Sequence, residues 1–171
     1  MMDYLEPYGV KVGRGKYHEE IVYRLVILSN RIIDEISIYL QTYKLTPAKM
    51  NTLMIVKHQG GESGMSQIDL SQRLMVSTSN LTRVLAKLQR DRLIRRGSIA
   101  TDKRFKTIHI TVKGSKLLDE VWPGYTKKLV SLTEGLDKEK KRILSEMLSD
   151  WMQFVDSGKK NSENVNLKIG D

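Results

Sequence analysis

Residues 76–88 read VSTSNLTRVLAKL, and this stretch has the pattern of an amphipathic helix. Its apolar residues recur at helical spacing and predict one buried stripe, formed by Leu81, Val84, Leu85 and Leu88. Ser77 stands just before the stripe, where a serine caps the first turn of a helix. The other side chains are short and polar at the start and cationic further along, so this helix exposes a polar, basic face.

A second, shorter helix comes directly before this one. Ser66 predicts its start, with Asp69 three residues later as a variant of the capping box, and the pattern runs to Leu74. Only Met75, Val76 and Ser77 then separate the two helices, a connection of the length that a helix-turn-helix requires. Residues 77–91 are therefore predicted to be the second helix of this motif.

Two short strands follow, LIRR at 93–96 and KTIHIT at 106–111, the second alternating apolar and polar residues. A polar tip, Gly97–Arg104, lies between them, and we expect Asp102 to shape the turn and hold Arg104. A hairpin with a basic tip after a basic helix is the layout of a winged helix, with residues 97–106 as the wing.

Longer helices flank this core. The apolar pattern predicts one helix from about His18 to Tyr43, and a second that starts at Thr46-Pro47 and stops at Gly60-Gly61. Two further helices follow the hairpin, and Pro123-Gly124 is expected to kink or split the first of them. The second starts at Asp137. Residues 1–16 are expected to order only on a partner.

The charge of the chain is strongly positive and localised. There are 29 Lys and Arg residues against 20 Asp and Glu, a net charge of +9. Between Arg83 and Lys106 nine basic residues face two acidic ones, which gives this segment a charge of +7. Such a cluster favours a polyanionic partner, although a solvated surface or a membrane surface would also tolerate it.

Several other classes of function find little support. The chain has no cysteine, which excludes disulfides and thiolate metal sites, and no apolar run long enough for a membrane span or signal peptide. We therefore expect a cytoplasmic protein without a membrane partner. No phosphate-binding loop or nucleophile motif indicates an enzyme, and no cofactor is predicted. A metal sensor built from His18 or His58 with Glu19 or Glu20 stays an open alternative.

The exposed side chains suit double-stranded DNA. The first turns of a helix can reach base edges in the major groove, where Asn80 can pair with adenine and Arg83 with guanine. Ser77 can cap the helix, contact DNA, or do both. The wing can reach the adjacent minor groove. The predicted DNA contacts are Ser77, Thr78, Ser79, Asn80, Thr82, Arg83, Lys87, Arg95, Lys103 and Arg104.

The segment from Leu45 to Gly114 resembles the MarR/SlyA family of winged-helix regulators. Residues 76–88 are similar to the family's recognition helix, and residues 93–96 to the strand after it. The most specific likeness is the wing pattern, D-x-R at Asp102–Arg104 followed by two strand apolars and T-x-x-G at Thr111–Gly114. One departure is Arg92, where the family commonly has glycine. A residue with positive φ, or a different helix exit, is therefore expected there.

The resemblance implies a mainly α fold with a small two-stranded β wing, and a homodimer in which the first helix and the last two intertwine. It implies a transcriptional regulator that reads a pseudo-palindromic operator, with recognition helices about 34–36 Å apart. It favours a repressor, and many family members are released by small, often aromatic, molecules. The alternative is an architectural or protein-interaction module without sequence preference. The resulting segments are an N-terminal arm (1–16), a dimerisation helix (17–44), a winged helix-turn-helix (45–112), C-terminal dimerisation helices (113–156) and a polar, unstructured tail (157–171).

Overall fold

The structure, a computed structural model, describes residues 4–13, 15, 17–99 and 102–166. For residues 98–99, 102–106 and 159–166 it describes the backbone alone. The chain divides into two compact units, residues 1–128 and residues 129–171, and each is described by itself.

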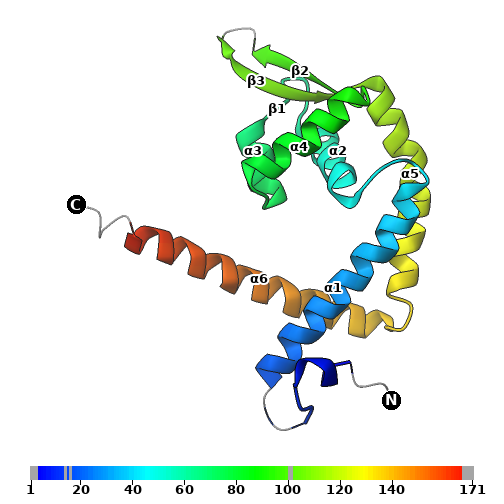
Figure 1. Cartoon of the computed structure of the whole chain (residues 1–171), viewed down its shortest axis with the longest axis vertical. Helices are drawn as coiled ribbons and strands as arrows, with labels where there is room; N and C mark the ends of the chain where they lie inside the picture. Colours follow the sequence, from blue (N-terminus) through cyan, green and yellow to red (C-terminus); the bar gives the residue numbers. More distant parts are fainter. Residues whose placement is uncertain (1–3, 14, 16, 100–101, 167–171) are drawn as a thin grey trace. The chain divides into compact units, whose positions relative to one another are not determined.

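The first unit is mainly helical and carries a small antiparallel sheet (Figure 1). The expected winged helix-turn-helix architecture is confirmed. The elements that start in this unit are the 3-10 helix η1 (Glu6–Tyr8), the helices α1 (Tyr17–Gln41), α2 (Pro47–Gln59), α3 (Gln67–Leu74), α4 (Thr78–Arg90) and α5 (Val112–Leu132), and the strands β1 (Met65–Ser66), β2 (Ile94–Ile99) and β3 (Asp102–Ile110).

Hydroxyl side chains start three of these helices where the sequence predicts them. In each case the capping oxygen accepts a hydrogen bond from the backbone N–H three residues later, which satisfies a donor that has no partner inside the helix. The capping residues are Thr46, Ser66 and Ser77. The motif helices α3 and α4 therefore begin at residues fixed by local chemistry.

The core of the winged-helix lobe is built from leucines on the inner face of α4. Leu81, Leu85 and Leu88 are at most 1% exposed, and α4 packs against α2, whose Met50 and Leu53 are also fully buried. Each fully buried side chain of this size contributes about 1.5–3 kcal/mol. This contact sets which face of α4 is left for solvent.

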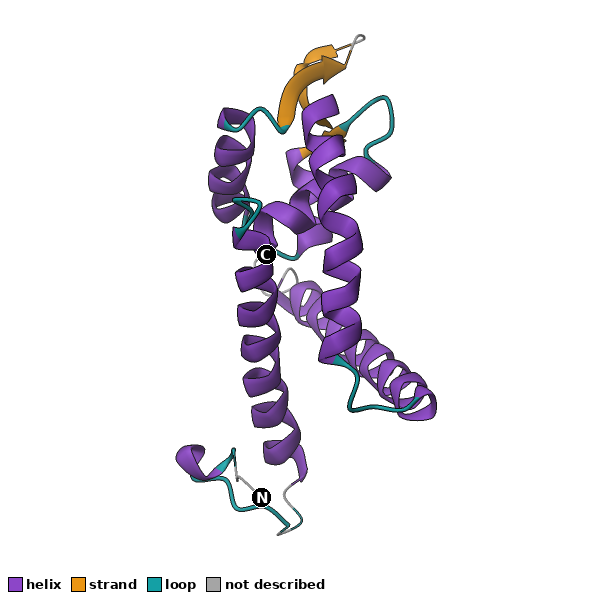
Figure 2. Ribbon diagram, turned by 90° about the vertical axis from the view of Figure 1, so that its right-hand side faces the viewer, coloured by secondary structure: helices purple, strands orange, loops and turns teal. Residues whose placement is uncertain are grey.

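The sheet has three strands in the order β1-β3-β2, one more than the sequence predicted. Residues Met65 and Ser66 pair with β3, Met65 opposite Ile108. A strand of two residues shows no alternation, so the sequence gives no sign of it. The strands β2 and β3 are longer than expected and extend into the segment predicted as the tip, with a register shift between Ser98 and Ile99. Figure 2 shows the strands at one end of this group of helices.

Helices α1 and α5 lie side by side (Figure 1) and are joined by polar contacts on both sides of Pro123. Before it, the Tyr39 hydroxyl donates to the Val121 carbonyl over 2.7 Å, and after it Lys128 and Glu35 form an ion pair of 2.5 Å. A proline removes one helical hydrogen bond, yet both halves are held against the same neighbour. Of the two expected effects of Pro123-Gly124, a kink or a split, the split does not occur, because α5 is one helix from Val112 to Leu132.

The N-terminal arm packs against α1, so the expectation that it orders only on a partner does not hold for the described residues. Leu5 and Val10 are 1% and 5% exposed. The Gly13 N–H donates to the buried Glu20 carboxylate over 2.8 Å, and the ring of Tyr8 lies against that of Tyr23. The arm buries only two apolar side chains, Leu5 and Val10, which are too few to form a periodic pattern in the sequence.

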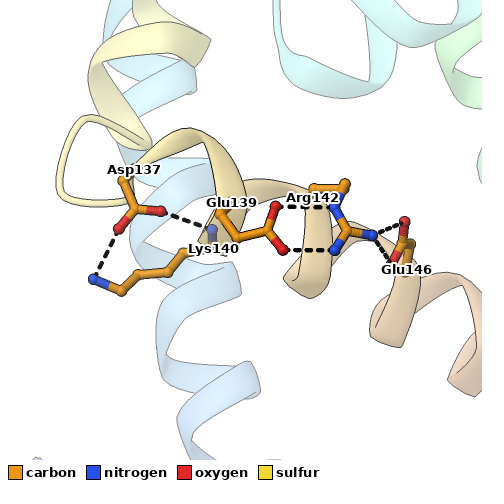
Figure 3. A network of polar contacts seen from close by, with 5 residues as sticks. All are labelled: Asp137, Glu139, Lys140, Arg142 and Glu146. Carbon is orange, nitrogen blue, oxygen red and sulfur yellow. Dashed lines mark hydrogen bonds and ion pairs between the residues drawn. The ribbon is translucent and has the colours of Figure 1, made fainter.

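The second unit contains the end of α5 and the helix α6 (Lys138–Asn166). Asp137 caps α6 as predicted, accepting from the Lys140 N–H over 2.8 Å. Figure 3 shows this cap beside Arg142, which pairs with Glu139 and Glu146 one turn away on either side. These pairs lie at the helical spacing that stabilises an exposed helix.

Helix α6 also continues past Ser157, where the sequence analysis placed the start of an unstructured tail. The helix ends at Asn166, and residues 167–171 lie outside the described part. Residues 157–166 contain no proline, and Gly158 costs a helix only about 1 kcal/mol relative to alanine. Polarity by itself therefore does not end the helix.

Candidate nucleic-acid interface

The turn between α3 and α4 is compact and ends on the cap of α4. Met75 has φ 52°, a left-handed conformation that few non-glycine residues adopt. Its N–H and that of Val76 donate back to carbonyl groups of α3, and Ser77 then caps α4. These bonds fix the direction in which α4 leaves the turn.

The outward face of α4 carries Ser79 and Arg83, four residues apart. Both side chains are exposed, and both lie across the helix from the buried leucines. The Ser77 hydroxyl oxygen caps the helix by accepting a hydrogen bond from the Asn80 N–H over 3.4 Å. The same oxygen lies 3.2 Å from the hydroxyl oxygen of Ser79. Within the described part of the chain Arg83 forms no ion pair. This face therefore presents a hydroxyl and a guanidinium group to solvent.

Two other predicted contact residues lie on the flanks of α4. Asn80 is on the side of α2, where it lines a cavity of about 480 Å³ with Asn51 and Thr52. Thr82 is on the side of α3, where its hydroxyl donates to the Thr78 carbonyl over 2.8 Å and accepts from Gln67 over 2.7 Å. The structure thus places Asn80 and Thr82 on opposite flanks of α4. Gln67, which the sequence did not single out, holds the Thr82 hydroxyl on its flank.

The cations extend from α4 to the wing. Lys87 on α4 and Arg95 on β2 are exposed, and neither forms an ion pair among the described residues. The backbone of Asp102, Lys103 and Arg104 runs in β3, but their side chains lie outside the described part. Exposed cations are therefore present both on α4 and at the base of the hairpin.

His109 occupies the base of the wing between two glycines. A Cβ atom placed on Gly64 or on Gly97 would lie 2.6 Å or 2.9 Å from its ring. The His109 Nε2 atom and the Thr107 hydroxyl are 2.8 Å apart and share a hydrogen bond. Burial, and then the charge of Arg95, hold the pKa of this imidazole below its ordinary value. At neutral pH it packs as an uncharged ring.

The chain leaves α4 through Arg92, and two lysines that the sequence did not single out, Lys49 and Lys113, hold this end of the helix. Arg92 has φ 59°, which confirms the expectation of a positive φ at this position. Lys49 of α2 donates to the Asp91 carboxylate over 2.8 Å, and Lys113 of α5 donates to the Asp91 carbonyl over 2.9 Å. The hydrogen bond from Lys49, against the opposing effect of burial, lowers the pKa of Asp91.

Neither a metal centre nor a membrane span stands out in what the structure describes. No cluster of three or more histidine or carboxylate side chains is arranged to hold a metal ion among the described residues. The same part of the chain has no helix that combines the length and apolarity needed to cross a bilayer.

The family model and the curated relatives that match this chain point to the same family of proteins. Residues 43–104 match the model of the MarR family. The HTH-type transcriptional regulator MhqR of Bacillus subtilis is 26% identical over 117 residues, which cover 68% of this chain and 79% of that protein. The HTH-type transcriptional repressor YetL of the same organism is 26% identical over 131 residues, 77% of this chain and 78% of that protein. The likeness to the MarR family model thus extends over residues 43–104 of this chain.

Solved structures of MarR-family proteins share the fold. The complex of MepR from S. aureus with DNA superposes with a TM-score of 0.70 at 23% identity, covering 77% of this chain and 96% of that one. A MarR variant from E. coli in complex with operator DNA gives 0.70 at 20% identity, covering 75% and 91%. The curated relatives are named as transcriptional regulators, in agreement with the expectation of a regulator rather than an enzyme.

Proposed function

We propose that this chain is a transcriptional regulator of the MarR family that binds double-stranded DNA with sequence preference. Residues 77–91 would enter the major groove, and the wing at 97–106 would lie at the adjacent minor groove. The observation that carries the proposal is the outward face of α4, where Ser79 and Arg83 are exposed and the guanidinium group forms no ion pair within the described residues. The DNA complexes of MepR and MarR support it.

The side chains divide into two classes of contact. Arg83 and Ser79 read base edges, because they lie on the outward face and within the first two turns of the helix. Lys87 and Arg95 neutralise phosphates, which adds affinity without sequence preference. Asn80 lies on the flank and reads a base only if its amide turns away from the cavity beside α2.

Exposed apolar side chains support a homodimer. On α1, Ile21, Val26 and Leu28 are 49–51% exposed, and on α6 Met147 and Phe154 are 63% and 75% exposed. Long helices that expose such residues along one side typically bury them against another chain. A second copy would bring a second recognition helix and hence a pseudo-palindromic site. Sedimentation of the purified chain should give twice the mass of 19.7 kDa.

The proposal extends to the role of a repressor, but not to release by a small molecule. The relative YetL is named a repressor. The cavity between α2 and α5, lined by Met54, Leu118 and Trp122 among others, has a volume of about 170 Å³. Ligand pockets for drug-sized molecules are typically 300–1,000 Å³. The described chain therefore offers no ready site for an aromatic effector at this position.

The test is selection of bound sequences from a random duplex library at physiological salt. The expected result is one enriched palindrome with half-sites about one helical turn apart. Arg83→Ala should then weaken binding to this operator by about 5- to 150-fold, since a bidentate base contact contributes roughly 1–3 kcal/mol. Lys87→Ala, the matched control on the same helix, should weaken operator and random DNA by equal factors.

Two results would contradict the proposal. Binding without any enriched motif would favour an architectural module, and no binding at all would favour a protein-interaction module. Equal losses on operator and random DNA for Arg83→Ala would remove Arg83 from the base-reading residues.

A further inference from the structure

The ion pair between Lys49 and Asp91 stands at the end of the recognition helix. Asp91 is the C-cap of α4, and its N–H is still bonded to the Lys87 carbonyl over 3.0 Å. The Lys49 ammonium group lies 2.8 Å from the Asp91 carboxylate and also donates to the Lys44 carbonyl over 3.3 Å. The Lys49 side chain is only 12% exposed, so both partners are held in one geometry.

The same helix end is bonded to the start of α5. The Lys113 ammonium group donates to the Asp91 carbonyl over 2.9 Å, and the Thr111 hydroxyl donates to the Arg92 carbonyl over 2.8 Å. Three parts of the fold, the turn after α1, the first turn of α2 and the first turn of α5, therefore meet at the last turn of α4.

An aspartate is a costly residue at this place. The C-terminal end of a helix carries partial negative charge, which disfavours a carboxylate there. Asp91 also lies in a segment with a charge of +7, where it opposes the attraction of phosphate groups. Neither the stability of the helix nor the affinity for DNA therefore explains an aspartate at position 91. The Asp91 carboxylate contacts Lys49 at 2.8 Å and Arg90 at 4.0 Å, so the close contact that remains is the one with Lys49.

The base-reading side chains lie at the other end of α4. The 13 residues of this helix span about 20 Å, so a tilt of about 5° at Asp91 displaces the first turn by about 1.7 Å. That end is held by its own cap and by the bond from Gln67 to Thr82. Contacts to base edges tolerate much smaller displacements than contacts to phosphates, because they need aligned hydrogen bonds.

We propose that Lys49 and Asp91 are positioning residues for sequence recognition. Their ion pair, together with the bond from Lys113 to the Asp91 carbonyl, sets the direction of α4 and thereby the fit of Arg83 to the bases. This inference rests on the proposed function. It predicts that loss of the pair lowers the preference for the operator over random DNA, because phosphate contacts survive a small tilt and base contacts do not.

The alternative is an ordinary stabilising ion pair, and the chain offers a matched control for it. Lys57, also on α2, forms an ion pair of 2.5 Å with Asp119 of α5, and among the described residues it has no hydrogen bond or ion pair with α4. Pairs of this kind contribute about 0–1 kcal/mol to stability. Lys49→Met and Lys57→Met therefore remove one lysine each from the same helix, but only the first releases the recognition helix.

The experiment measures the dissociation constants of the full-length protein for the selected operator and for random duplex, and takes their ratio. For Lys49→Met this preference should fall at least fivefold, and for Lys57→Met it should stay within about twofold, at a temperature where both variants are folded. Asp91→Asn, which keeps the shape of the side chain, should reproduce the loss. The double variant Lys49→Met with Asp91→Asn should lose no more than either single variant, because the two residues act as a unit.

Each other result overturns the inference. An unchanged preference in Lys49→Met and Asp91→Asn, or equal losses in Lys49→Met and Lys57→Met, would make the pair merely structural. Losses that multiply in the double variant would mean that the two residues act separately. A wild-type protein without operator preference would contradict the proposed function itself, and would leave nothing for the pair to position.

Discussion

The hydroxyl of Tyr39 donates a hydrogen bond to the backbone carbonyl of Val121, and the two oxygens lie 2.7 Å apart. The contact joins α1 to α5 just before Pro123, and it brings the tyrosine ring against the backbone of the next turn. Gly124 makes this approach feasible, because a Cβ atom there would lie 2.3 Å from the Tyr39 hydroxyl.

Gly124→Ala should therefore destabilise the protein, by about 1–3 kcal/mol, although alanine normally stabilises a helix relative to glycine. The free energy of unfolding in urea measures the effect. Gly135→Ala is the control, since no atom lies within 4 Å of a Cβ atom placed there. If Gly124→Ala lowered the free energy of unfolding no more than Gly135→Ala does, the Tyr39 side chain would move aside without cost and the prediction would be wrong.

Tyr39 should also make the protein less stable at high pH. Burial, and then its contact with Tyr43, raise the pKa of Tyr39 to about 12 from its usual 10.0. A folded-state pKa above the unfolded value means that the neutral form is preferred in the fold. This contribution is complete below pH 10 and is lost as the pH rises from 10 to 12. Unfolding midpoints of wild type and Tyr39→Phe, measured across this range, should converge. Parallel curves would contradict the prediction.

Arg92→Gly should stabilise the protein. A side chain at φ 59° strains the backbone, while glycine adopts this conformation freely but loses more entropy on folding. The expected net gain is about 0.5–1 kcal/mol in chemical denaturation. Arg92→Ala removes the same charge and keeps the strain, so it should show no gain. A gain in both variants would assign the effect to charge.

Asp91 should lose its contribution to stability in acid. Its pKa lies below 3.8 in the folded protein, mainly because of the hydrogen bond from Lys49. A lowered folded-state pKa means that the contribution is complete above pH 3.8 and is lost as the pH falls below it. An NMR titration of the Asp91 carboxyl group should show a higher pKa in Lys49→Met. The same value in both proteins would assign the shift to other charges.

The winged-helix lobe could be predicted from sequence because local and tertiary signals agree there. Ser66 and Ser77 mark helix starts, and the leucines of α4 mark its buried face, so the motif and its outward residues follow directly. The conformation of Arg92 could be predicted as well. The family that the segment resembles commonly has glycine at this position, which indicates a positive φ, and Arg92 has φ 59°.

The features that could not be predicted depend on contacts between distant segments. The strand β1 consists of two residues whose partner is more than 40 positions away, and nothing local indicates that pairing. The continuity of α5 through Pro123 depends on contacts with α1. Lys49 and Lys113 look like two of many surface lysines until the fold places both beside Asp91.

The ring of His109 fills the space that side chains at Gly64 and Gly97 would occupy. In evolutionary terms these three positions are not independent, because a side chain at either glycine becomes tolerable only after the imidazole has been replaced by something smaller. Gly64 is restricted twice, since its φ of 73° also disfavours other residues. Among related sequences, position 97 should therefore vary together with position 109, whereas position 64 should stay glycine even where the histidine has been lost.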